Sequence, residues 1–336
     1  MRCYRPLGWR KKIKKLSNPM KHYLEAKYDK VHWGILSSDI PPVLTINSGD
    51  HIEITTVSGP PEVVVNCPYK VKESLLEIHA KTFRGTLQGG HICTGPIEVN
   101  GSKRGEVLQV EISSVELDSD WAYTGIAPLK GALPDDFKNK HVTYLEINKK
   151  NKIAKTPWGM NIDLDPFFGV ITTAPPVEWG KLPTVPPRKN GGNMDNKELK
   201  PGSTLYLPVF NDGALFSVGD GHGTQGDGEI CTAAVEMDMR GEFVLKNRSD
   251  MSLEWPFAET QDFLITMAFD PDLDECVKIV TREMIKFLNL YGDLSREDAY
   301  TLLSYVGDLR ITQVVNGNKG VHLMLPKKYF NKTFKI

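Results

Sequence analysis

Two pairs of potential ligand or acid–base residues flank a run of glycines near the middle of the chain. Residues 219–228 read GDGHGTQGDG, and Glu229 follows directly. Asp220 and His222 are two residues apart, as are Asp227 and Glu229, so each pair would point to one side of an extended segment. An imidazole beside a carboxylate is typical of a site for zinc or a similar divalent ion, whereas paired carboxylates suit proton transfer. The glycines would let the backbone approach an ion or a substrate closely.

Two other kinds of loop share part of this pattern. Residues 221–226 match the phosphate-binding sequence G-x-G-x-x-G, but that motif requires a helix N-terminus after the glycines. Here acids and a β-favouring run, residues 230–235, follow instead. An EF-hand is disfavoured because His222 and Thr224 stand where that loop places its carboxylate or amide ligands. A tight turn with solvated acids remains the alternative to a metal site.

Further polar residues occupy similar glycine-rich settings. Asn193 and Asp195 lie in GGNMDNK, and His91 lies in QGGHICTGP. Glu236 ends the apolar run ICTAAVE, where strand alternation would place it on the face opposite Glu229. The alternatives are a hydrogen-bonded turn histidine and a solvated glutamate at a strand end. The shared settings favour convergence of these residues on one site.

The elements that must position these residues are mostly β. Residues 43–46, a Ser-Gly-Asp turn and the alternating residues 52–55 predict two consecutive strands. Residues 97–99, the Asn100-Gly101 turn and the alternating residues 107–112 repeat this pattern, and Asn-Gly between such runs is typical of a hairpin.

A change of composition divides the chain. Residues 156–202 are rich in proline and glycine and predict a long loop between two β-rich halves, about 40–155 and 203–336. After Asp270, which is the expected N-cap, an apolar stripe predicts a helix that stops at Gly292, and Ser295 predicts the start of a second. We therefore expect a mainly β (α+β) fold with sandwich-like sheets and a few packed helices, two of them near the C-terminus.

Composition limits the classes of function. The 336 residues carry a net charge of −1, so no overall basic field favours nucleic acid. No run of residues is apolar enough for a membrane helix. Five cysteines without a CxxC pair suit a reducing compartment, and we expect a cytoplasmic protein. Residues 1–30 are expected to form a basic N-terminal extension, and residues 31–336 a single catalytic domain.

Taken together, the motifs resemble the acetamidase/formamidase family. The resemblance is carried, in the family's order, by the segments HICTGPIEVNGSKRGEVLQVEI, GGNMDNKELKPGSTLYLPVFNDGALFSVGDGHGTQGDGEICTAAVEM and AYTLLSYVGDLRITQVVNGNKGVHLMLPK. It implies a mostly β fold, hydrolysis of small linear amides such as formamide or acetamide, and zinc or calcium near the acidic segment. It also implies a homodimer.

The resemblance also implies a set of site residues. We expect a zinc ion, or alternatively calcium, to be held by Asp195, Asp220 and His222, with His91 as a further candidate. A metal-activated water would attack the amide, and the acid–base candidates are Glu229, Glu236 and Asp227. The substrate-binding candidates are Asn193 and Gln225, whose side-chain amides would donate to the developing oxyanion, and Phe167 and Phe168. The two phenylalanines depart from the family's pattern and would reshape its pocket. A lactamase-like hydrolase of larger or cyclic amides and a non-catalytic metal-binding β-sandwich are the alternatives.

Overall fold

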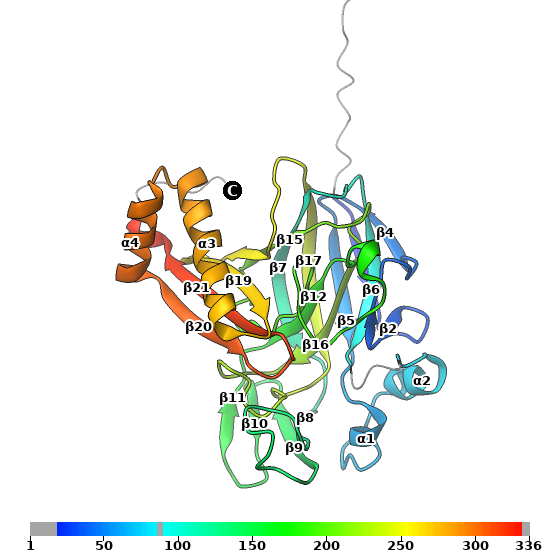
Figure 1. Ribbon diagram of the computed structural model, residues 1–336. Helices are drawn as coiled ribbons and strands as arrows, with labels where there is room; N and C mark the ends of the chain where they lie inside the picture. The colour runs from blue at the N-terminus through cyan, green and yellow to red at the C-terminus, as the bar shows by residue number, and fades with distance from the viewer. Residues whose placement is uncertain (1–18, 86–89, 331–336) are drawn as a thin grey trace, which may run out of the picture.

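Two packed β-sheets form the centre of the molecule (Figure 1). The computed structural model describes residues 19–85 and 90–330. The larger sheet has nine strands, in the order β1 (Lys21–Leu24), β5 (His51–Thr56), β17 (Met239–Arg248), β7 (Val107–Leu117), β15 (Thr204–Pro208), β18 (Phe257–Glu259), β19 (Phe263–Asp270), β21 (Lys319–Pro326) and β20 (Asp308–Gln313). The six-stranded sheet has the order β14 (Gly191–Asn193), β12 (Phe167–Thr172), β16 (Phe216–His222), β6 (Ile92–Asn100) and β2 (Val31–Trp33), with β4 (Leu44–Asn47) beside β6.

The largest hydrophobic core lies between these two sheets. Phe243 of the larger sheet contacts Phe168 and Phe216 of the smaller one, with ring centroids 5.6 and 5.9 Å apart. All residues of β12 and β16 are buried, which explains why β12 reads as a nearly continuous apolar run rather than an alternating one. The predicted mainly β, sandwich-like fold is confirmed.

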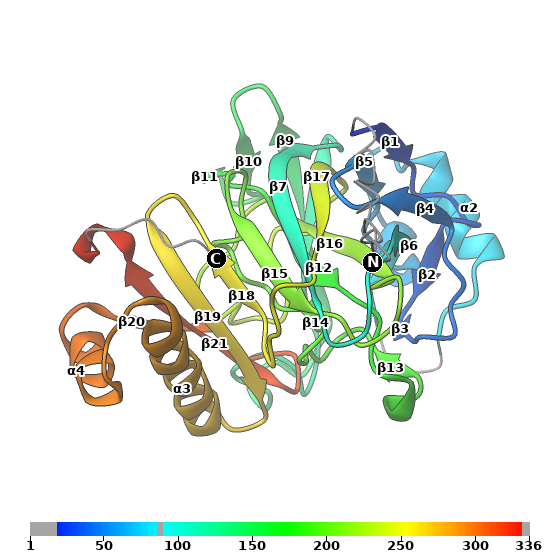
Figure 2. The same ribbon diagram turned by 90° about the horizontal axis from the view of Figure 1, so that it is seen from above.

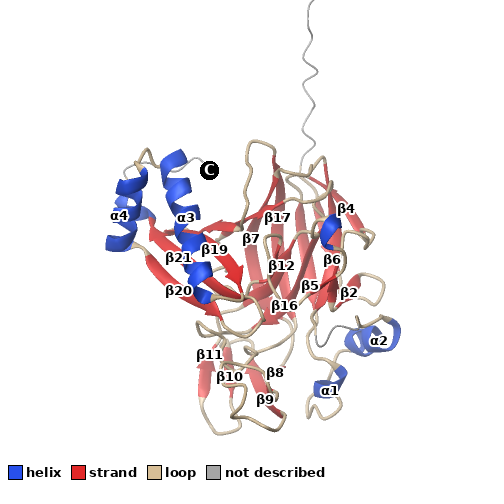
Figure 3. Cartoon of the chain, viewed as in Figure 1, coloured by secondary structure: helices blue, strands red, loops and turns tan. Residues whose placement is uncertain are grey.

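Smaller elements surround the sandwich (Figures 1 and 3). A four-stranded sheet of β11 (Asn161–Asp163), β10 (Ile153–Lys155), β9 (His141–Asn148) and β8 (Trp121–Ile126) extends from one end, and β13 (Leu182–Pro183) pairs with β3 (Ile35–Leu36). The helices are α1 (Pro61–Val64), α2 (Glu73–Lys81), α3 (Leu273–Tyr291) and α4 (Arg296–Val306), with single 3₁₀ turns at Val177–Trp179 and Lys327–Tyr329. Within the described residues, no helix is long and apolar enough to cross a membrane.

The two predicted C-terminal helices are present and cover one face of β19 and β21 (Figure 2). The N-cap of α3 is Asp272, two residues later than predicted, and its carboxylate accepts a hydrogen bond from the Asp274 amide at 2.9 Å. Asp270 is instead the last residue of β19, so the strand extends to the turn that precedes the helix. Ser295 caps α4 as predicted and accepts from the Asp298 amide at 3.0 Å.

The predicted hairpin at Asn100-Gly101 is wrong, although a turn is present there. Gly101 has a φ of +84°, which only glycine adopts easily, but the strands on its two sides belong to different sheets. The Ser-Gly-Asp turn likewise joins β4 of one sheet to β5 of the other. Both turns therefore connect the two layers of the sandwich, and the strand pairs in each layer come from distant parts of the chain.

The predicted loop over 156–202 is also wrong in part. Phe167–Thr172 form β12, an interior strand of the six-stranded sheet, paired on its two sides with β14 and β16. Residues 173–202 come closer to the prediction, because their regular structure is limited to the short strands β13 and β14 and a single 3₁₀ turn. A strand forms within this proline- and glycine-rich stretch because FFGVIT itself lacks proline and is apolar on both faces.

His32 links two strands that both lead to the site described below. On β2, its Nδ1 lies 2.8 Å from the Ile35 carbonyl, and its Nε2 lies 3.0 Å from the Ser217 hydroxyl on β16. Burial lowers the pKa of His32 to about 4, because the charged ring would lose its hydration. The ring is therefore neutral in the folded protein at neutral pH.

His32 makes stability depend on pH. Its folded-state pKa lies below the usual value of about 6.5, so the unfolded chain binds a proton that the folded chain does not. The free energy of unfolding should therefore fall by about 2 kcal/mol from this group alone between pH 7 and pH 5. Urea unfolding at both pH values should show a smaller fall in His32→Gln than in the parent. The exposed His51→Gln is the matched control, and equal falls in all three proteins would contradict the prediction.

Candidate active site

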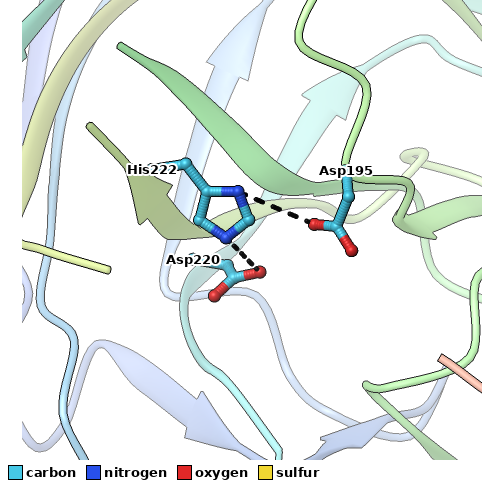
Figure 4. Close-up of side chains that lie close together, drawn as sticks. All are labelled: Asp195, Asp220 and His222. Carbon is cyan, nitrogen blue, oxygen red and sulfur yellow. Dashed lines mark ion pairs between the residues drawn. The ribbon is translucent and has the colours of Figure 1, made fainter. Parts of the chain in front are cut away.

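The strand β16 presents Asp220 and His222 to one side, as their spacing predicts. The His222 Nε2 lies 3.3 Å from the Asp220 Oδ2. Asp195 follows β14, and its Oδ1 lies 3.9 Å from the His222 Nδ1 (Figure 4). All three side chains are buried, and their ligand atoms lie within 4.8 Å of one another. The structure therefore brings together three of the four residues predicted to bind a metal.

The backbone at these residues is strained. Asp195, Asp220 and Glu229 have φ values of 50°, 58° and 47°, in the left-handed region that residues with a Cβ rarely adopt. Each such residue costs on the order of 1 kcal/mol or more, and such strain is found preferentially at functional sites. The surrounding sheet holds these carboxylates in directions that relaxed strand or helix geometry would not give.

Gln225 fixes the orientation of the His222 ring. Its amide nitrogen donates to the Asp195 carbonyl at 2.8 Å, which turns its amide oxygen toward the His222 Nδ1 at 3.0 Å. The Nδ1 therefore carries the proton in the neutral ring, and the Nε2 keeps its lone pair. A hydrogen bond of this kind on the far nitrogen is typical of histidines that bind metals.

The buried atoms that face one another include several without a hydrogen-bond partner. These are the His222 Nε2, the Asp195 Oδ1 and the Glu229 Oε2. The Glu236 Oε1 lies 3.2 Å from the His222 Nε2. Buried polar atoms are rarely left without a partner, and those that are call for an explanation such as an ion. A nitrogen and several carboxylate oxygens form a donor set that suits zinc better than calcium, which prefers oxygen alone.

The charges of the cluster require compensation. Burial raises the pKa of Asp195, Glu229 and Glu236, because a carboxylate loses its hydration inside the protein. At Asp220 the same effect of burial is outweighed by His91 and His222, and its pKa falls below the usual range.

His222 responds in the opposite direction. Burial lowers its pKa, but Glu236 and Asp220 outweigh that effect and bring the pKa well above its usual value. Four carboxylates and two imidazoles make up the cluster, so with all four carboxylates ionised negative charge is in excess even when both rings are protonated. A bound divalent cation would compensate for that excess.

Glu229 and Glu236 lie on the same side of the site, and the predicted strand between them is wrong. Residues 230–235 form turns and bends, with a hydrogen bond from the Thr232 amide to the Glu229 carbonyl. The chain thus folds back between the two glutamates, and their carboxylates both come within 4.8 Å of His222. Strand alternation failed here because the segment turns instead of extending, which leaves Ile230 exposed.

Other predicted residues have different surroundings. The His91 Nε2 lies 3.6 Å from the Asp220 Oδ2, at the edge of the cluster. Asp227 is exposed and forms an ion pair with Lys197 at 3.1 Å. Phe167 places its ring edge-on to His222, with centroids 5.1 Å apart, whereas Phe168 packs in the core. The substrate-binding role of the two phenylalanines stays a prediction.

Sequence reasoning missed two residues that shape the site. Asn316, in the turn between β20 and β21, donates from its side-chain nitrogen to the Asp195 Oδ2 at 2.5 Å. At Gly169 of β12, a Cβ would lie only 2.5 Å from both the Asp195 Oδ1 and the Asp220 Oδ2. A glycine inside an apolar strand is a signal of close approach by other groups, and FFGVIT carries that signal. Nothing in the sequence around Asn316 places it beside Asp195.

A cavity of about 270 Å³ adjoins the cluster. Asn193, Asp220, Glu229 and Glu236 line it, together with His91 and Asn316. Its apolar walls come from Trp33, Val57, Ile92, Val185 and Val315. Tyr123, which is paired through its backbone with Glu236, also lines the cavity. Polar groups that converge beside apolar walls in one cavity are typical of a site for a small molecule.

The fold and the site together define a β-sandwich protein with a buried imidazole–carboxylate centre that opens into a cavity. The chain belongs to the acetamidase/formamidase family, whose model matches residues 20–182 and 179–248. The matched residues include every member of the cluster from His91 to Glu236, whereas Asn316 lies outside them. The predicted family resemblance is confirmed.

Individual relatives agree with this family. The chain is 31% identical to an acetamidase of Mycolicibacterium smegmatis over 206 residues, which are 44% of this chain and 51% of that protein. It is 32% identical to a formamidase of Methylophilus methylotrophus over 200 residues, 44% of this chain and 49% of that protein. The chain thus spans about half the length of the curated relatives it matches.

Solved structures match over nearly the whole chain. A predicted acetamidase/formamidase of Thermoanaerobacter tengcongensis is 28% identical with a TM-score of 0.80, covering 92% of this chain and 97% of that one. An acetamidase of Yersinia enterocolitica is 25% identical with a TM-score of 0.81, covering 94% of each. A gamma lactamase of Delftia acidovorans, at 22% identity and a TM-score of 0.59 over 93% of this chain and 94% of that one, shows a shared fold alone.

Adding a methyl group at Gly169 should disrupt the candidate metal site. In Gly169→Ala the new Cβ would push the Asp195 and Asp220 carboxylates apart, so zinc affinity should fall by about tenfold or more. Competition with a chromophoric chelator measures the affinity. Gly226→Ala is the matched control, because a Cβ there meets nothing within 4 Å. Circular dichroism checks that both variants fold, and equal zinc affinity in the two would contradict the role given to Gly169.

Proposed function

We propose that this chain hydrolyses the C–N bond of a small linear amide to a carboxylate and ammonia. The observation that carries the proposal is the buried His222 Nε2, which lies 3.3 Å from the Asp220 carboxylate and 3.2 Å from the Glu236 carboxylate beside the cavity. Membership of the family supports it, as do the names of the relatives, an acetamidase and a formamidase.

The residues present fit a divalent ion, and we propose zinc. Asp195, Asp220 and His222 would hold it, with His91 or Glu236 completing the set. When bound, such an ion lowers the pKa of a water and polarises the amide carbonyl. Gln225 and Asn316 keep the His222 ring and the Asp195 carboxylate in place.

Glu229 is the better placed of the two glutamates for proton transfer. The Glu236 Oε1 already accepts from the Ala234 amide at 2.9 Å and lies beside the His222 Nε2. The Glu229 Oε2 has no hydrogen-bond partner among the described residues, and both glutamates line the cavity. Glu229 would therefore take the proton of the attacking water and return it to the departing nitrogen.

Asn193 is the better placed of the two predicted amide donors. The Gln225 side-chain nitrogen is occupied by the Asp195 carbonyl, and Gln225 acts by orienting His222. Asn193 lines the cavity beside Asp220. Its side-chain nitrogen would donate to the amide oxygen as negative charge develops there.

Removal of the metal should abolish ammonia release from formamide and acetamide. Treatment with a strong chelator should reduce the rate to background, and added zinc should restore it, because His222 and its carboxylate neighbours bind the ion that activates water. Ammonia is measured by a coupled assay. A rate that is indifferent to the chelator would contradict the metal mechanism.

Glu229→Gln should lower kcat by about 10²–10⁴-fold while zinc content stays unchanged, because the amide keeps the shape but cannot accept a proton. Asp212→Asn is the matched control, since Asp212 is exposed and paired with Lys103 at 2.7 Å. Zinc content is measured by atomic emission. If Glu229→Gln were as active as Asp212→Asn, the prediction would be wrong and another residue would have the acid–base role.

A further inference from the structure

The cavity has cations on the wall that faces solvent. Arg84 and Lys130 line it, and both residues also line a surface groove that continues from the cavity along Pro60 and Gly125. Lys140 is a further cation that lines that groove, and the carboxylate in the groove lining is that of Glu62. The cavity is therefore polarised, with carboxylates and imidazoles around the proposed reaction centre and cations toward the groove.

The position of Arg84 is fixed by two neighbours. Its Nη1 lies 2.7 Å from the Glu62 Oε1, and its guanidinium carbon lies 5.1 Å from the centre of the Trp33 ring. Trp33 is buried and itself lines the cavity. An arginine held on an aromatic face loses less freedom when it binds an anion, because its planar group is already oriented.

Lys130 adds a positive charge to the cavity lining. In the described part of the chain, no carboxylate lies within ion-pair distance of it. The single glutamate of the groove is shared with Arg84, so the cations of the cavity mouth exceed the anions. Such a mouth attracts anions and raises their local concentration. The proposed reaction on a neutral amide such as formamide gives these cations no role.

The size of the cavity also exceeds what the smallest amides need. Its volume is about 270 Å³. One water takes about 30 Å³ in the liquid, and acetamide is only a few water molecules in size. The cavity therefore has room for an amide longer than acetamide.

We propose that the preferred substrate is an amide that carries a carboxylate at its other end, held by Arg84 and Lys130. This inference rests on the proposed amide hydrolysis at the same site. The guanidinium binds a carboxylate through two parallel hydrogen bonds, and the amide then reaches the cluster of His222 and Glu229. The apolar residues that line the cavity suit the methylene groups that join the two ends.

The test compares acidic amides with neutral isosteres. Malonamate, succinamate and glutaramate vary the distance between amide and carboxylate, and 4-oxopentanamide replaces the succinamate carboxylate with a methyl ketone of the same shape. We expect one acidic amide to have a kcat/KM at least about tenfold above that of its neutral counterpart, because charge-assisted hydrogen bonds are strong. This ratio should fall toward one in Arg84→Gln and decrease in Lys130→Gln. Lys149→Gln is the control, since Lys149 is exposed and pairs with Asp120 at 2.7 Å.

A second readout does not need turnover. Calorimetric titration compares succinate with butyrate, which lacks the second carboxylate. Succinate should bind more tightly to the parent protein and to Lys149→Gln, and lose that advantage in Arg84→Gln.

Hydrolysis of neutral amides without any preference for acidic ones, and with equal binding of succinate and butyrate, would overturn the inference and leave the proposed function intact. Tighter binding of succinate through Arg84 without hydrolysis of any amide would overturn the proposed function but retain the anion site. Neither hydrolysis nor a binding preference would overturn both.

Discussion

The structure depends on keeping several carboxylates buried around one imidazole. Asp195, Asp220, Glu229 and Glu236 all surround His222 away from water. Removing charges from water costs several kcal/mol each, and removing one partner of such a group costs 3–5 kcal/mol, on the order of the whole stability of many domains. The sandwich must therefore supply enough apolar burial to offset this cost, and the long core between its two sheets does so.

The backbone delivers these side chains by two kinds of exception to regular strands. Three of the four carboxylates lie on or beside residues with left-handed φ values, which redirect them out of the sheet. Gly169 leaves the space over β12 that two of them occupy. The exceptions at Gly169 and Asp220 are tolerable because the strands that carry them, β12 and β16, are buried on both faces and paired on both edges.

The sequence predicts which residue types form the site better than it predicts how the fold positions them. The spacing of Asp220 and His222 predicted that the two side chains lie together, and they do, although the left-handed φ of Asp220 departs from the regular strand geometry on which that prediction rests. The contributions of Gly169 and Asn316 depend on which strands become neighbours, and that pairing involves residues far apart in the chain. The turn at Gly101 shows the same limit, since its local geometry is correct but the layer that the chain enters next is decided by tertiary packing.

The hydrogen bond between Asn316 and Asp195 joins the turn between β20 and β21 to the middle of the chain. During synthesis, the segment with Asp220 and His222 leaves the ribosome well before this turn exists. The ligand set can therefore reach its final geometry only after the last strand pair has docked. Metal capture would thus come late in folding, and a nascent chain that stops short of β21 would hold the same carboxylates without the arrangement that binds an ion tightly.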